Sequence, residues 1–141
     1  MRIAILTVAS LFTLSTAQLG MAGDSVSIEP GLWEVSTTMT SPMFPQPRVQ
    51  TQQECMTESQ ITPETLAPSD NGECSISSTD ISGNTLNWTM VCNTQGGAMN
   101  GQGSFESKGD TGSGNMTMNM DIEGQSFSME IVWKGRRVDS C

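Results

Sequence analysis

The four cysteines are the residues whose chemistry this sequence predicts most directly. An even number of cysteines in a small chain bound for an oxidising compartment is typical of a disulfide framework. A zinc site is the rival interpretation, but the chain has no CxxC pair and no histidine to supply zinc ligands. We therefore predict two disulfides, and no metal site, among Cys55, Cys74, Cys92 and Cys141.

Methionine is the second residue type with chemistry to offer, because thioethers are soft ligands that select Cu(I). Met116, Met118 and Met120 alternate along one predicted strand, and Met90 and Met129 fall on neighbouring strands. Methionine also fills irregular cores well, because its side chain is flexible. Since the chain has no histidine to complete a copper site, Cu(I) binding is a minor alternative to core packing.

Catalytic groups are sparse in this sequence. Without histidine there is no conventional Ser-His or Cys-His nucleophile, and disulfide-bonded cysteines cannot attack a substrate. Glycosidase-type acid–base chemistry needs two carboxyl groups within about 10 Å of each other. The acidic residues are instead scattered over polar positions and turns. We expect no catalytic residues and no cofactor, and a protein that is not an enzyme.

The three tryptophans fall on the apolar positions of predicted strands. They either anchor a filled core or, if a curved sheet leaves its interior open, line an apolar pocket. Methionines beside them would let such a pocket adapt to varied apolar ligands. The candidate pocket residues are Trp33, Trp88, Met90, Met116, Met118, Met120, Met129 and Trp133.

The first 22 residues predict a secretory signal peptide. Arg2 precedes an apolar run at residues 3–14, and small residues allow cleavage after Ala22 or, alternatively, after Ala17. The run is shorter than the roughly 20 residues that span a bilayer, and no cysteine stands nearby to carry a lipid. We expect a periplasmic or secreted domain of residues 23–141 that keeps no membrane anchor.

The charge of the chain excludes one class of partner. The formal net charge is −9, and removal of Arg2 with the signal peptide makes it −10. A chain this acidic repels phosphate backbones and anionic membranes, so we expect no nucleic-acid partner. About 119 residues would remain after cleavage, enough for one domain with a modest core.

The elements that position these residues are mostly strands. From Glu73 onward, apolar and polar residues alternate between glycine-bearing turns, as in an antiparallel sheet with one buried face. Two further strands are predicted at residues 31–40 and 48–55, around a proline-rich loop, and one short helix within residues 57–66. The predicted fold class is all-β: a strongly curved antiparallel meander or partly closed β-barrel of about seven strands, with one short helix, stapled by disulfides.

The first of two glycine turns predicts a register for its hairpin. Gly109-Asp110 suits a two-residue type II′ turn, which has glycine in the first position. This turn places Phe105 opposite Gly114 and Gly103 opposite Met116. Apolar positions thus face apolar positions, as a buried sheet face requires.

The second glycine turn predicts a register for the next hairpin. Gly124-Gln125 also suits a type II′ turn with glycine first. This turn places Met120 opposite Met129 and Met118 opposite Ile131, again with inward residues facing one another.

The register of the hairpin around residues 82–84 also predicts which cysteines pair. A three-residue turn at residues 82–84 brings Cys74 opposite Cys92 on the inward face, where a cross-strand bridge is natural. Cys55 and Cys141 then pair by elimination.

Two glycines predict where the sheet bends. A symmetric loop at residues 93–98 pairs Met90 with Gly101 and Trp88 with Gly103. A glycine opposite a bulky side chain lets a sheet curve inward, so we expect strong curvature here.

The sequence also resembles a known family. The features that carry the resemblance are the opening Pro30-Gly31-Leu32-Trp33-Glu34-Val35, Cys55 before a short helix, the run from Ser82-Gly83-Asn84 to Cys92, and a methionine-alternating strand before a terminal cysteine. Together they resemble the bacterial exported family catalogued as domain of unknown function 3617, over residues 30–141. The resemblance implies a Gram-negative exported protein, and it brings no established activity and no catalytic residues.

The sequence therefore predicts an exported, non-enzymatic periplasmic β-domain that binds a small apolar molecule. The alternative is an envelope protein–protein interaction module, which would use the outer face, a sheet edge or the loop at Met43-Phe44. Exposed apolar area inside a cavity favours the first, and exposed apolar area on a loop or edge favours the second. The oligomeric state stays open at this stage.

Overall fold

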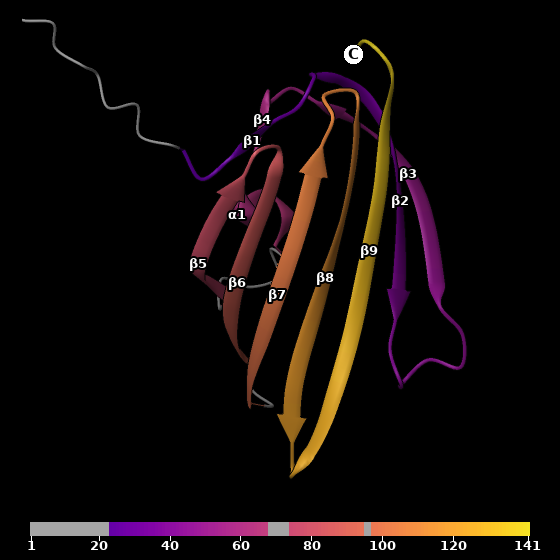
Figure 1. Ribbon diagram of the computed structural model, residues 1–141. Coiled ribbons are helices and arrows are strands. Elements are labelled where there is room, and N and C mark those ends of the chain that lie inside the picture. Colours follow the sequence, from indigo (N-terminus) through magenta and orange to yellow (C-terminus); the bar gives the residue numbers. More distant parts are fainter. Residues whose placement is uncertain (1–22, 68–73, 95–96) are drawn as a thin grey trace, which may run out of the picture.

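The computed structural model describes residues 23–67, 74–94 and 97–141, so the predicted signal peptide lies outside the described residues. Within them the chain forms nine strands and one helical turn (Figure 1). The elements are β1 (Val26–Ser27), β2 (Gly31–Thr40), β3 (Arg48–Met56), β4 (Gln60–Ile61), α1 (Pro63–Leu66), β5 (Cys74–Ser82), β6 (Thr85–Thr94), β7 (Gly97–Ser107), β8 (Thr111–Ile122) and β9 (Gln125–Asp139).

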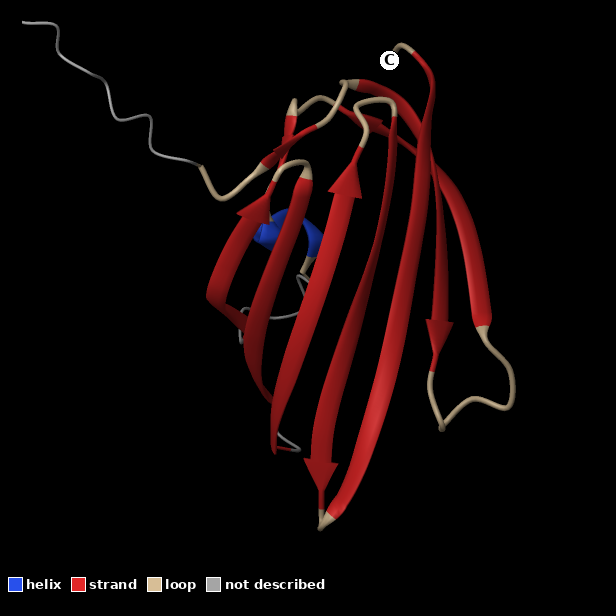
Figure 2. Cartoon of the chain, viewed as in Figure 1, coloured by secondary structure: helices blue, strands red, loops and turns tan. Residues whose placement is uncertain are grey.

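Seven of the strands form one antiparallel sheet in the order β3-β2-β9-β8-β7-β6-β5 (Figure 2). Strands β5 to β9 follow one another as hairpins, and β9 then pairs with β2, which pairs with β3. The two edge strands, β3 and β5, do not pair with each other, so the sheet is not closed. The predicted curved meander is confirmed.

One face of the sheet carries the core, as the alternation predicted. Along β6 the side chains of Leu86, Trp88, Met90 and Cys92 are buried, while the residues between them are partly exposed. A period of two places alternate side chains on opposite faces of a strand. The buried phase therefore defines the concave, inward face of the sheet.

A small cover packs on this inward face, and of its parts only the short helix was predicted. It consists of β1, β4 and α1: β1 pairs with β4, and α1 contacts β5 and β6 (Figure 1). Val26 and Ile61, which face each other in the β1–β4 pair, are both buried in the core. The cover gives this part of the fold a second layer.

The predicted short helix is confirmed as a single turn. Of the predicted segment at residues 57–66, only Pro63–Leu66 forms a helical turn, with Thr62 at the N-cap and proline in the first turn. Gln60 and Ile61, in the first part of this segment, pair with β1. Proline is favoured at the start of a helix, where its missing N–H has no partner to lose.

The register predicted for the β7–β8 hairpin is confirmed. Phe105 lies opposite Gly114, and Gly103 lies opposite Met116. Gly109 has a φ of 86°, in the region that favours glycine.

The register predicted for the β8–β9 hairpin is wrong by two positions. The turn is Glu123-Gly124, where φ is 50° and 81°, and a type I′ turn needs positive φ at both central residues. Met118 therefore lies opposite Met129, and Met120 opposite Phe127. A shift of two positions keeps every side chain on its face, so the inward phase stands although the partners change.

The predicted pairing of Cys74 with Cys92 is confirmed, although the turn beside it differs. The turn has two residues rather than three, and a bulge between Ile76 and Ser78 restores the predicted alignment further along β5. The two cysteines form a disulfide whose Cα atoms lie 3.9 Å apart.

The second predicted disulfide, between Cys55 and Cys141, is also confirmed, with the Cα atoms 5.7 Å apart. Leu32 of β2 lies opposite Cys55 of β3 on one side and opposite Asp139 of β9 on the other. The bridge thus ties the edge strand β3 to the end of β9 across β2.

Glycines admit the largest core side chains, as predicted. Trp88 lies opposite Gly103 and Met90 lies opposite Gly101. A Cβ atom at Gly103 would overlap the indole ring of Trp88. Trp88 can therefore pack here only because residue 103 is a glycine.

Candidate ligand-binding pocket

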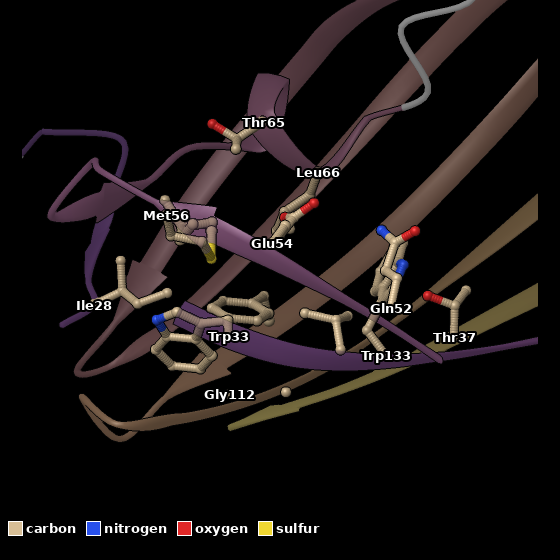
Figure 3. Close-up of a pocket in the computed structure, with 14 residues that line it drawn as sticks. Ile28, Trp33, Thr37, Gln52, Glu54, Met56, Thr65, Leu66, Gly112 and Trp133 are labelled. Atoms are coloured by element: carbon tan, nitrogen blue, oxygen red, sulfur yellow. The ribbon is translucent and has the colours of Figure 1, made fainter. Parts of the chain in front are cut away.

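A pocket of about 190 Å³ lies between the concave face of the sheet and the cover (Figure 3). Strands β2, β3, β7, β8 and β9 contribute side chains or glycine backbone from the sheet, and β4, α1 and the segment after β1 contribute from the cover. The lining residues are Ile28, Trp33, Val35, Thr37, Gln52, Glu54, Met56, Ile61, Thr65, Leu66, Phe105, Gly112, Trp133 and Gly135.

Two tryptophans stand at the two ends of the pocket in Figure 3. Trp33 is buried, and its Nε1 donates a hydrogen bond to the backbone oxygen of Glu29 over 2.9 Å. Gly135 lies next to Trp33, and a Cβ atom at Gly135 would come within 3.3 Å of the ring. A side chain at Gly135 would narrow the pocket, so glycine keeps this part open.

Backbone hydrogen bonds hold the cover in place. The Ile28 N–H donates to the oxygen of Ser59 over 2.9 Å, and the Glu29 N–H donates to the oxygen of Gly109 over 3.0 Å. These bonds join the segment after β1 to the chain before β4 and to the β7–β8 turn. They fix the apolar side chain of Ile28 at the pocket wall.

The rim of the pocket is polar and comes mainly from β3. Glu54 lies opposite Trp33, and Gln52 lies opposite Val35, so both project from the same face of the sheet as the apolar lining. Both residues are exposed. Within the part of the chain that the structure describes, Glu54 makes no salt bridge. The mouth of the pocket thus carries one carboxylate without a cationic partner among the described residues.

Of the eight candidate pocket residues, Trp33 and Trp133 line this pocket. Four others are buried in the adjoining core: Trp88, Met90, Met116 and Met118. The last two, Met120 and Met129, are half-buried further along the concave face.

Several lining residues were missed by the sequence reasoning. Phe105 fell on a predicted inward phase and could have been included. Ile28, Ile61 and Leu66 lie outside the long alternating strands, in the cover, and period-two alternation carries no signal for them.

The buried methionines meet at a glycine. A Cβ atom at Gly101 would lie 2.6 Å from the Sδ of Met118 and 3.2 Å from the Sδ of Met90. Both side chains are almost completely buried, so these thioethers fill the core. Among residues 23–67, 74–94 and 97–141, no group of three His, Cys, Asp or Glu side chains could hold a metal ion.

A second hollow lies on the opposite, convex face over β5 to β8, and it is polar. Its lining includes Asp80, Asn87, Gln102, Asn115 and Thr117. Trp88 is the one large apolar side chain in its lining, so the pocket under the cover is the better site for an apolar ligand.

An ion pair on the convex face lies away from both hollows. The Nη2 of Arg136 donates to the Oε1 of Glu34 over 2.8 Å, and Nε donates to the same oxygen over 3.1 Å. These hydrogen bonds and the positive charge of Arg136 lower the pKa of Glu34. The pair clamps β2 to β9 at the surface.

The described part of the chain contains no helix that is long and apolar enough to span a membrane. In comparisons with known proteins, residues 28–141 match a family described as protein of unknown function (DUF3617). No curated protein and no solved structure matches the chain.

Proposed function

Because the chain belongs to the DUF3617 family, whose description states no function, we propose from the geometry alone that it binds a small apolar molecule under the cover. We place this activity in the periplasm of a Gram-negative bacterium. Two disulfides support an oxidising compartment, where such bonds persist.

The observation that carries the proposal is the size and lining of the pocket. An engineered protein cavity of about 150 Å³ lined by Leu, Ile and Phe binds benzene. The pocket here measures about 190 Å³ and is lined by aliphatic and aromatic side chains, including Trp33 and Trp133. It has room for one aromatic ring with a few extra carbons, or for the end of an alkyl chain.

The concave face beyond the pocket supports an elongated ligand. The half-buried residues Met39, Met99 and Met129 pack against the core on this face, and the half-buried Met120 lies opposite Met99. Methionine side chains adapt to the shape of what they contact. A chain anchored under the cover could therefore extend along this methionine surface.

The rim restricts the charge of the ligand. Glu54 stands at the mouth, and the chain as a whole is strongly acidic. A carboxylate or phosphate group at the mouth would face like charge, which is unfavourable. The ligand class we propose is a neutral or cationic apolar molecule.

The first experiment is mass spectrometry of protein purified from the periplasm, under native and denaturing conditions. The denatured mass reports signal cleavage and the loss of four cysteine hydrogens. An excess native mass that disappears on denaturation identifies a retained ligand. A native mass equal to that of the oxidised chain, together with the absence of dye binding below, would contradict the proposal.

The second experiment measures binding of the neutral apolar dye N-phenyl-1-naphthylamine by fluorescence. Val35→Phe places a larger side chain in the pocket, so we expect it to weaken dye binding at least about tenfold, which corresponds to ~1.4 kcal/mol. Val132→Phe is the matched control, because Val132 projects from the convex face near β2. Equal binding by both variants would place the dye elsewhere.

A protein contact at the envelope is the second candidate function. Met43, in the loop between β2 and β3, is 63% exposed. Contact surfaces are marked by contiguous exposed apolar patches, whereas Met43 is a single side chain, so this candidate ranks second. A bare native mass, with no dye bound, would favour this candidate over ligand binding.

A further inference from the structure

The free edge of β3 is the most exposed part of the sheet. Every residue of β3 from Arg48 to Cys55 is exposed. Within residues 23–67, 74–94 and 97–141, β3 pairs with β2 and with no other strand. Its outer row of backbone N–H and C=O groups is thus open to another strand.

This edge lacks several of the features that usually prevent strand addition. Proteins protect sheet edges with charged side chains, especially lysine, and with proline, bulges or covering elements. β3 contains neither lysine nor proline, and its pairing with β2 runs without a bulge. The opposite edge strand, β5, carries the bulge beside Ile76 and contacts α1. Of the two edges, β3 is therefore the one suited to pairing.

The sequence of β3 is self-complementary about one residue. In a symmetric antiparallel pair, facing residues must lie on the same side of the sheet, so the two-fold axis passes through a residue. An axis at Thr51 places Arg48 of each copy opposite Glu54 of the other. With an axis at Gln50 or Gln52, each charged residue would instead face a neutral side chain or a position outside β3.

The two charged residues are available for this contact. Arg48 lies opposite Met39 and Glu54 opposite Trp33, which places both on the concave side of β3. Neither forms a salt bridge within the described part of the chain. The Arg48 guanidinium lies 4.0 Å from the centroid of the Phe44 ring, a contact that holds the side chain while its charge stays unpaired.

We propose that β3 is a homodimer contact: it pairs antiparallel with β3 of a second copy about a two-fold axis at Thr51, with two Arg48–Glu54 ion pairs. The contact joins two sheets edge to edge through backbone hydrogen bonds. A single strand pair buries little area, so the dimer is weak and depends on protein concentration. The Cys55–Cys141 bridge supports it by fixing β3 to the sheet.

Sedimentation velocity of the disulfide-bonded protein over a concentration series tests the proposal. We expect a monomer–dimer equilibrium. Arg48→Glu alone and Glu54→Arg alone each set like charges opposite one another twice, so each should raise the dissociation constant about tenfold. The double variant R48E/E54R recreates both ion pairs in reverse and should restore association.

Recovery in the double variant separates a cross-strand contact from a local role of either side chain. Loss of the Phe44 contact is common to R48E and to the double variant, so that loss cannot produce the recovery. Asp80→Arg on β5, a charge reversal at the other edge, is the control and should leave association unchanged. The proposal is overturned if the wild-type protein stays monomeric at every concentration, or if the double variant dimerises no better than the single variants.

Discussion

Glu54 is the residue that would most constrain the proposed ligand. It stands at the mouth of an otherwise largely apolar pocket and makes no salt bridge in the described chain. A charge at a partly wet rim changes affinity modestly, because water screens it. Its effect should therefore appear in the comparison of ligands that differ only in charge.

Dye displacement by decylammonium and by decanoate measures that effect. At protein concentrations where the chain is monomeric, we expect decylammonium to displace the dye better. Glu54→Gln should reduce the preference by up to roughly fivefold, since an exposed charge contact is worth at most ~1 kcal/mol. Glu34→Gln, on the convex face, is the control. A preference for decanoate in the wild-type protein would show that Glu54 does not face the ligand.

At the scale of elements, alternation predicted which face of each strand is buried but not every partner. The β7–β8 register was predicted correctly because Gly109 occupies the position that its turn requires. In the next hairpin the sequence predicted Gly124 at the first turn position, whereas Glu123 adopts positive φ and Gly124 comes second. A glycine suits either position, and a shift of two residues preserves the inward phase, so alternation could not reveal the error.

The β8–β9 turn provides a stability prediction. A type I′ turn favours Asn followed by Gly, because asparagine tolerates positive φ better than glutamate does. We expect Glu123→Asn to raise the free energy of unfolding by about 0.5–1 kcal/mol, measured by urea denaturation. If the turn were instead at Gly124-Gln125, residue 123 would lie in a strand, and asparagine there would lower stability.

At the scale of the whole molecule, the pocket lies between two layers, the curved sheet and the cover. The sequence predicts the first layer better than the second. The curved sheet follows from alternation and from glycines opposite Trp88 and Met90. The cover depends on the pairing of two strands of two residues each, β1 and β4, and so short a pairing leaves no periodic pattern. The side of the pocket formed by Trp33 and Trp133 was thus predictable, and the side formed by Ile28, Ile61 and Leu66 was not.

The long disulfide should stabilise the domain more than the short one does. Cys55 and Cys141 are 86 residues apart in sequence, against 18 for Cys74 and Cys92. In the chain-entropy description, a loop of this length stabilises the fold by about 4–5 kcal/mol. We expect Cys55→Ser/Cys141→Ser to lower the free energy of unfolding by that amount in urea denaturation. A loss below ~1 kcal/mol would mean that the bridge barely restricts the unfolded chain.

The position of Glu54 couples the two proposals thermodynamically. A cationic ligand in the pocket and Arg48 of a second copy would compete for the same carboxylate. By linkage, the factor by which such a ligand weakens self-association equals the factor by which self-association weakens the ligand. A high concentration of the protein in its compartment would then favour the dimer, release a cationic ligand and retain a neutral one. The abundance of the protein would thus select between ligands by their charge.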